Sequence, residues 1–235
     1  MSKSRLEAFA DGVFAIAATL LVLSVDAQVP SGSRDLRQAL LDIWPSYVAY
    51  VLSFVTIGIL WINHHTVMHQ VGHVNRTFLF LSVGLLMAVS FVPFPTRLVA
   101  EHIQDDGAQA AALAYGITLT TTATFFNALW LYASRGGRLL LANADPRLVS
   151  GITRSYLPGP WIYLGATLVA LVNAGLSVAL FVVIAIFYVV DSALFGNRGE
   201  QDAAGGTTAK EARPASETAR DTGKHRRRRP GVIRD

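Results

Sequence analysis

Long apolar stretches separated by short polar connections dominate residues 1–196. A helix needs about 20 mostly apolar residues to cross the roughly 30 Å hydrocarbon core of a bilayer. The pattern predicts an all-α integral membrane protein with six transmembrane helices, the last two joined as a tight hairpin at the break Asn173-Ala174-Gly175. The predicted spans are Leu6–Val25, Trp44–Val67, Thr77–Val99, Ala108–Ala133, Gly159–Val172 and Leu176–Phe195.

Two alternatives change this count. Five spans would result if the last two stretches fused, but more than about 30 unbroken residues are too long for one helix even when tilted. A cleaved signal peptide is suggested by Lys3 and Arg5 before an apolar run, but Glu7 and Asp11 interrupt the start of that run. The first helix is therefore kept as a mature span.

The charges predict the orientation. Arginines concentrate in the Ser134–Tyr156 connection, which carries four against the single acid Asp145, and basic residues also occur at the N-terminus, at Arg76 and in the run Arg226–Arg229. With six spans all of these lie on one side, and the positive-inside rule makes that side cytoplasmic. Both termini are therefore predicted in the cytoplasm. Seventeen arginines against three lysines are typical of a G+C-rich bacterial source, so we expect the protein in a bacterial plasma membrane.

Composition divides the chain into two parts. Residues of the AVILMFWYC set make up 52% of the chain and charged residues 15%, and the whole net charge of +4 comes from residues 197–235. We expect a transmembrane domain over 1–196 and a disordered basic cytoplasmic tail over 197–235, because that tail has almost no large apolar residues to bury. The basic run favours anionic lipid over nucleic acid as its partner.

The first helix carries the most informative pattern. At about 100° per residue, a stripe of mostly bulky apolar residues with one hydroxyl falls on one face: Phe9, Gly12, Ile16, Thr19, Leu20 and Leu23. The other face is small and polar, which would let neighbouring helices approach closely: Asp11, Ala15, Ala18 and Val22. From periodicity alone, contact with lipid is the simplest interpretation of the stripe.

Asp11 is a carboxylate inside a predicted span, which is costly unless it is paired or hydrogen-bonded. We expect its partner on the second helix, where polar residues cluster from Trp61 to His69. His65 and His69 are spaced as metal ligands on one helix face, but no carboxylate accompanies them. A structural network is therefore favoured over a metal site.

Several functional signatures are absent from the sequence. It has no Thr-Val-Gly-Tyr-Gly filter loop, no glycine-rich phosphate loop, no Gly-x-Ser-x-Gly elbow and no cysteine. The prolines of Pro93-Phe94-Pro95 predict a kink in the third span. We expect no enzyme activity and no cofactor.

The motifs together resemble the transmembrane protein 175 family of potassium channels. Arg5-x-x-x-Phe9-Ala10-Asp11-Gly12 is similar to the family's first-helix signature, which usually has serine where this chain has Ala10. Trp61-x-x-His64-His65 and Pro93-Phe94-Pro95-Thr96 also resemble family motifs.

The resemblance implies a six-helix subunit unrelated to filter-type potassium channels and a homotetramer whose four first helices line one pore. It implies a constriction at Ile16, further apolar rings at Leu20 and Leu23, and a threonine ring at Thr19 that favours potassium. It also implies that a set of motif residues braces the pore helix: Arg5, Phe9, Asp11, Trp61, His64 and His65. Potassium and other monovalent cations would permeate, with only modest selectivity.

Two other functions fit parts of the sequence. A proton-coupled secondary transporter could use Asp11 and the second-helix histidines as a relay, although Asp11 lies about 140° around the helix from Ile16. A non-conducting structural membrane protein fits the composition but leaves the stripe and the motifs unexplained.

Overall fold

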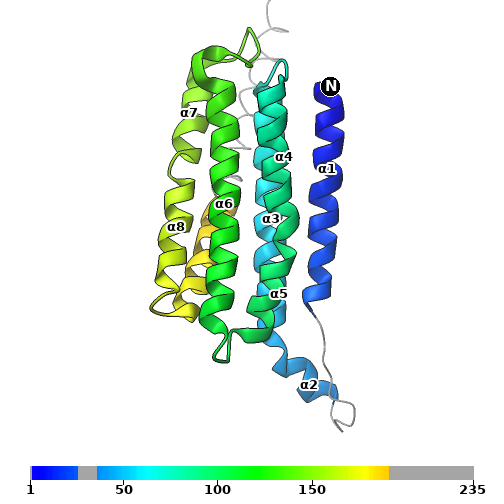
Figure 1. Ribbon diagram of the computed structural model, residues 1–235, viewed down its shortest axis with the longest axis vertical. Helices are drawn as coiled ribbons and strands as arrows, with labels where there is room; N and C mark the ends of the chain where they lie inside the picture. The colour runs from blue at the N-terminus through cyan, green and yellow to red at the C-terminus, as the bar shows by residue number, and fades with distance from the viewer. Residues whose placement is uncertain (1, 26–35, 191–235) are drawn as a thin grey trace, which may run out of the picture. The chain divides into compact units, whose positions relative to one another are not determined.

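Helices account for nearly all the regular structure in residues 2–25 and 36–190, which are the residues that the computed structural model describes (Figure 1). The contacts between helices place Met1–Val189 in one compact unit. The elements are α1 (Lys3–Leu20), the 3-10 helix η1 (Leu21–Ser24), α2 (Leu36–Asp42), α3 (Trp44–Gln70), α4 (Arg76–Phe91), α5 (Pro93–His102), α6 (Ala108–Ser134), the 3-10 helix η2 (Arg135–Gly137), α7 (Pro146–Tyr156), α8 (Gly159–Val169) and an apolar helix at Ala174–Val190.

The predicted all-α fold is confirmed. Within the described residues, three helical stretches have the length and hydropathy needed to cross a membrane: Lys3–Ser24, Trp44–Gln70 and Arg76–His102. The helix Ala174–Val190 is apolar but shorter. The count of six spans stays a prediction, and the predicted tail at 197–235 lies outside the described residues.

The third predicted span is two helices. α4 ends at Phe91 and α5 begins at Pro93, with Val92 between them. Pro93 and Pro95 have no backbone N–H to continue the α4 hydrogen-bond ladder, so the chain restarts a helix with proline in its first turn. The kink predicted from the prolines is present at this point.

The Ser134–Tyr156 segment, expected as a connection, contains the helix α7. Asp145 caps α7 by accepting a hydrogen bond from the Arg147 N–H at 2.8 Å, and Pro146 occupies its first turn. On its inner side the indole N–H of Trp130 in α6 donates to Thr153 Oγ1 at 2.9 Å. Because this helix is polar, the pattern of apolar stretches did not predict it.

The junction between α7 and α8 depends on a side chain of α6. Pro158 and Pro160 remove backbone donors just after α7 ends. The amide of Asn127 donates to the Tyr156 carbonyl at 2.7 Å and so satisfies an acceptor that the interrupted helix leaves free.

The hairpin predicted after α8 is present, but its turn lies earlier than expected. The chain turns over 170–172, while Ala174 and Gly175 already belong to the next helix. The reason is Asn173, whose side-chain oxygen accepts a hydrogen bond from the Leu176 N–H at 2.8 Å and so caps that helix.

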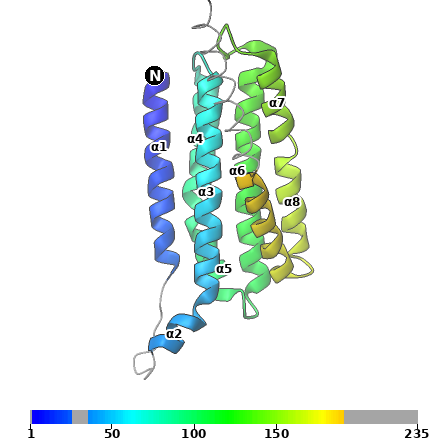
Figure 2. The same cartoon turned by 180° about the vertical axis from the view of Figure 1, so that it is seen from behind.

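Packing contacts arrange the helices in a definite order. α1 packs against α3 and α4, while α6 packs against α4 and α5 on one side and α8 on the other. In both views α1 runs along one edge of the unit and α7 and α8 along the opposite edge (Figures 1 and 2). The helix that carries the predicted stripe is therefore peripheral within a single copy of the chain.

Candidate functional site

The face of α1 that packs inside the chain is a third face, which the sequence analysis did not single out. It consists of residues spaced by three or four positions, all buried: Leu6, Ala10, Phe14, Ala17 and Leu21. The small and polar face was expected at helix contacts, but Asp11, Ala15 and Val22 are exposed. Within one copy, the close helix approach expected on this face is therefore not seen at these residues, apart from the contact of Asp11 with α3.

The apolar stripe of α1 is exposed along its length. The exposed fractions of Ile16, Leu20 and Leu23 are 60%, 43% and 64%. Phe9, on the same stripe, is 52% exposed. A run of large apolar side chains on a membrane-length helix, uncovered by the rest of the described chain, needs lipid, another copy of the chain or a pore beside it.

Thr19 is the hydroxyl-bearing residue of this stripe, and it is also exposed. Its Oγ1 donates to the backbone carbonyl of Ile16 at 2.9 Å. Because this bond uses the hydroxyl proton, the oxygen keeps its lone pairs for an outside partner. Thr19 can therefore offer an oxygen ligand to a cation, whereas its neighbours on the stripe offer none.

Asp11 finds a partner on α3. The indole N–H of Trp61 donates to Asp11 Oδ1 at 2.9 Å and joins α1 to the middle of α3. Asp11 itself is exposed in the single copy. Arg5 is exposed on the first turns of α1, and no ion pair of its side chain occurs among the described residues.

The histidines of α3 take up two different environments. His64 is buried, and its ring lies 5.5 Å from that of Phe14 in α1. His65 stacks on Trp61 at 6.2 Å, and its Nε2 lies 3.0 Å from Nε2 of His69. Within 2–25 and 36–190, three or more His, Cys, Asp or Glu side chains do not gather as a metal site would require.

One buried polar atom lacks a partner at the α1–α3 contact. Nε2 of His64 is inaccessible and makes no hydrogen bond. Ala10 is completely buried on the same face of α1 as Phe14, one turn away, and its methyl group offers no hydrogen bond. The network therefore contains the Asp11–Trp61 bond and the Phe14–His64 contact, but no polar link between His64 and α1 within the described residues.

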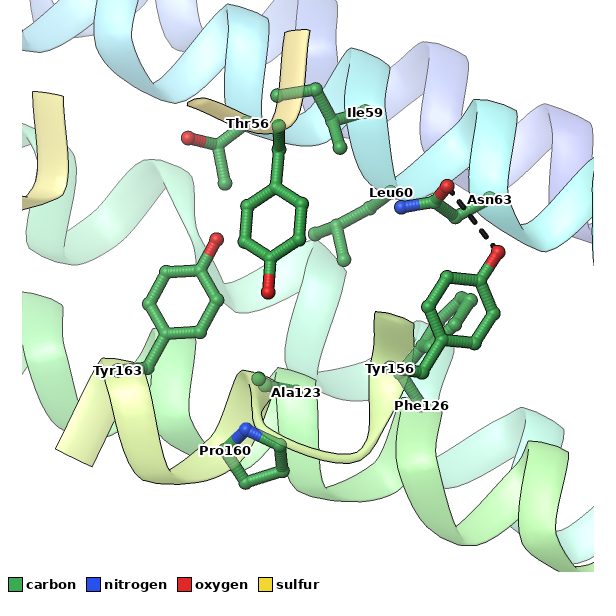
Figure 3. A pocket seen from close by; sticks show the side chains of 11 residues that line it. Thr56, Ile59, Leu60, Asn63, Ala123, Phe126, Tyr156, Pro160 and Tyr163 are labelled. Atoms are coloured by element: carbon green, nitrogen blue, oxygen red, sulfur yellow. Dashed lines mark hydrogen bonds between the residues drawn. The ribbon is translucent and has the colours of Figure 1, made fainter. Parts of the chain in front are cut away.

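A small cavity lies behind this site, between α3, α6, α8 and the last apolar helix (Figure 3). Asn63 and Tyr156 lie at one end, where the tyrosine hydroxyl donates to Asn63 Oδ1 at 3.3 Å, and Tyr163 lies at the other. Its volume of about 40 Å³ suits a few water molecules. The cavity is separate from the stripe on α1, and sequence reasoning missed it because it depends on how the helices pack.

The family model and the similar proteins found by comparison all point to the same family. The sequence model of the family described as "Endosomal/lysosomal potassium channel TMEM175" matches residues 5–93. A protein of Chamaesiphon minutus named a potassium channel is 41% identical over 192 residues, which cover 80% of this chain and 94% of that protein. A potassium channel of Streptomyces collinus is 40% identical over 189 residues, covering 78% of this chain and 90% of the relative.

The fold has a match among solved structures. The crystal structure of a lysosomal potassium-selective channel TMEM175 homologue from Chamaesiphon minutus superimposes with a TM-score of 0.74 at 38% identity. The match covers 81% of this chain and 97% of that one. Similarity therefore extends over α1 and the helices that pack around it.

Proposed function

This chain belongs to the TMEM175 family, and from that premise we propose that it is a potassium channel whose pore is lined by α1. The relatives of Chamaesiphon minutus and Streptomyces collinus, both named potassium channels, match it over nearly their whole length, which supports the same activity here. Four identical copies would surround the pore, each contributing one α1. The family is one of ion channels, so the proposal involves neither an enzyme reaction nor a cofactor.

The observation that carries the proposal is the exposed stripe on α1. Exposure alone would fit lipid as well as a pore, and membership of a channel family favours the pore. α1 runs along one edge of the unit, so identical copies can bring their stripes together around a symmetry axis without rearranging the other helices (Figure 1).

Ile16 forms the proposed constriction, with further apolar rings at Leu20, the last residue of α1, and at Leu23 in η1. A narrow apolar ring closes a pore by excluding water, because its side chains offer nothing to replace hydration. Opening would require the four helices to separate enough for a largely hydrated cation to pass. Thr19 oxygens, with lone pairs left free, would replace part of that hydration and favour potassium.

The Asp11–Trp61 hydrogen bond supports a bracing role for the motif residues. It fixes the rotation of α1 about its own axis relative to α3, so the stripe points away from the other helices. Phe14 against His64 adds an apolar contact about one turn further along α1. Arg5, Phe9 and His65 belong to the same proposed motif, close in sequence to these contacts.

The proposed setting is a bacterial plasma membrane with six spans and both termini in the cytoplasm. Its partners are three further copies of the chain, the lipid bilayer, and potassium and other monovalent cations, but no nucleic acid. Its basic segments favour this orientation through the positive-inside rule.

A proton-coupled carrier is the alternative function, and the liposome flux experiment described next distinguishes it from a channel. It would pass protons between Asp11 and the histidines, but Asp11 is hydrogen-bonded to an indole N–H, which is a donor only and does not ionise at neutral pH. Among the described residues no hydrogen bond joins Asp11 to a histidine. A channel fits the stripe and the network together.

Ion flux through liposomes containing the purified protein tests the proposal. We expect passive potassium flux that does not saturate as carriers do and needs no proton gradient. Ile16→Asn should raise this flux because an amide hydrates the constriction, and Ile16→Phe should lower it by narrowing the constriction.

Val51→Asn is the matched control, because Val51 is an apolar residue of similar exposure on α3 and not on the helix proposed to line the pore. Equal flux through well-folded Ile16→Asn and wild-type protein would remove Ile16 from the pore. Flux that requires a proton gradient would favour the carrier.

A further inference from the structure

The outer face of α7 carries two arginines with no assigned role. Arg147 and Arg154 lie seven residues apart, which is almost two full helical turns, and therefore project from the same side of α7. The opposite side faces α6, where Ile152 is buried and the Tyr156 ring packs edge-on against Phe126. The two guanidinium groups thus share a face turned away from the helix packing.

Neither arginine side chain forms an ion pair or a hydrogen bond within the described part of the chain. Both are exposed. Asp145, the acid nearest in sequence, accepts the backbone N–H of Arg147 as the helix cap. The segment 135–157 contains four arginines and this one acid, so its net charge is strongly positive.

Gly151 leaves open space between the two arginines. It falls on the same face of α7, and a Cβ added there would meet no heavy atom within 4 Å. Two leucines flank the face with large exposed fractions, 49% for Leu148 and 51% for Leu157. The surface therefore combines positive charge, room beside the backbone, and apolar side chains.

The position of α7 suits contact with a bilayer surface. α7 and α8 follow one another along α6 (Figures 1 and 2). With 11 residues each, the two helices together extend about 33 Å at 1.5 Å per residue, slightly more than the roughly 30 Å hydrocarbon core. The first turn of α7 then lies at the level of the headgroups. Arg154, about 10 Å deeper, can extend its long side chain back to that level.

We propose that the outer face of α7 binds the headgroup of an anionic phospholipid, with the phosphate between Arg147 and Arg154 over Gly151. Leu148 and Leu157 contact the upper part of the acyl chains, which distinguishes a lipid from a soluble phosphate or an acidic protein. The inference rests on the proposed function only for orientation: with α1 at the pore axis, α7 on the opposite edge faces lipid.

Binding to purified, detergent-solubilised protein tests this directly. Dioctanoyl phosphatidylglycerol is the probe and dioctanoyl phosphatidylcholine the uncharged reference, with retained lipids counted by native mass spectrometry over a titration. We expect tighter binding of phosphatidylglycerol, weakened about fivefold by each of Arg147→Gln and Arg154→Gln, as about 1 kcal/mol per basic residue implies.

Matched variants distinguish lipid binding at this site from a general effect of the protein's positive charge. Gly151→Glu places a negative charge between the arginines and should weaken binding, whereas Gly151→Ala should leave it unchanged. Arg97→Gln removes an exposed arginine in α5 and should also leave it unchanged.

Undiminished binding by the double variant Arg147→Gln/Arg154→Gln, or equal loss in Arg97→Gln, overturns the proposal. Equal competition by glycerol 1-phosphate also overturns it, since the lipid chains would then add nothing. No ion flux enters this measurement, so failure here and failure of the channel proposal are distinguishable.

Discussion

In the proposed channel, different side chains on α1 contact the ion and hold the helix in position. Thr19 uses its proton within the helix and keeps its oxygen lone pairs outward, whereas Asp11 uses its carboxylate to hold Trp61 of α3. The two residues point to different sides of the same helix. Substitutions at the two positions should therefore change different measurements.

Thr19→Val tests the ion-contact role. Valine keeps the branched shape of threonine and removes only the oxygen. We expect a preference for potassium over sodium that falls about fivefold, comparable to the loss of one modest polar contact of about 1 kcal/mol. Reversal potentials under mixed-ion conditions measure this preference, and an unchanged elution volume controls for assembly. Unaltered selectivity would place Thr19 away from the permeating ion.

Trp61→Phe tests the position-holding role. It removes the indole donor from Asp11 and should lower the free energy of unfolding by about 1 kcal/mol, the size of an ordinary hydrogen bond, because both side chains are exposed in the single copy. Asp11→Ala, which removes the accepting oxygen, should then cost much less in the Trp61→Phe background than in the wild type, and a double-mutant cycle measures the difference.

Trp161→Phe is the control for that cycle, because Trp161 is 73% exposed on α8, and it should change stability by less than about 0.5 kcal/mol. Additive costs of the Asp11 and Trp61 substitutions would show that the hydrogen bond contributes nothing to stability.

Among the elements, α6 and α8 approach each other through small side chains. A Cβ at Gly116 in α6 would overlap the side chain of Thr167 in α8, so only glycine allows this separation. Thr167 Oγ1 also lies 3.2 Å from Thr120 Oγ1 of α6. At the other contact of α6, Ser53 Oγ lies 2.8 Å from Thr96 Oγ1 and 3.0 Å from the Tyr115 hydroxyl, joining α3, α5 and α6.

Gly116→Ala should therefore destabilise the protein by about 1–3 kcal/mol through overpacking, although alanine is the better helix former. Gly165→Ala is the matched control on α8, where an added Cβ meets nothing within 4 Å, and it should be neutral or stabilising. Thermal unfolding in detergent measures both. Adding Thr167→Ala to Gly116→Ala should recover part of the loss, and no recovery would contradict the close contact.

The sequence predicted helices best where apolar length and proline determine them. The helices α3 and α6 and the break before Pro93 follow directly from those signals. α7 was missed because its polar outer face breaks the apolar run, and its cap Asp145 is recognisable only once a helix is suspected.

α1 has two apolar faces, and only packing decides that Phe14 is buried while Ile16 is exposed. The pairing of Asp11 with Trp61 likewise depends on the register between α1 and α3, which no single-sequence pattern contains.

At the scale of the whole molecule, the two ends of the helices differ in charge. The loop from α5 to α6 contains Asp105 and Asp106, and hydrogen bonds from the His102 side chain and the Gly107 N–H lower the pKa of the Asp105 carboxyl. The segment after α6 contains the exposed arginines. A hydrogen bond from the Gly72 N–H to the Leu139 carbonyl, at 2.7 Å, connects this segment to the end of α3. α6 separates these two regions by about 40 Å, more than the hydrocarbon thickness.

This separation makes the orientation testable with two single cysteines, because the chain has none of its own. Gln104 and Asn143 are both exposed, one before α6 and one after it. In right-side-out bacterial vesicles, a membrane-impermeant maleimide should label Gln104→Cys in intact vesicles and Asn143→Cys only after permeabilisation, since the arginine-rich segment stays in the cytoplasm. Labelling of both in intact vesicles would mean that α6 does not cross the membrane. Labelling of Asn143→Cys alone would reverse the orientation and place the α7 arginines at the outer leaflet.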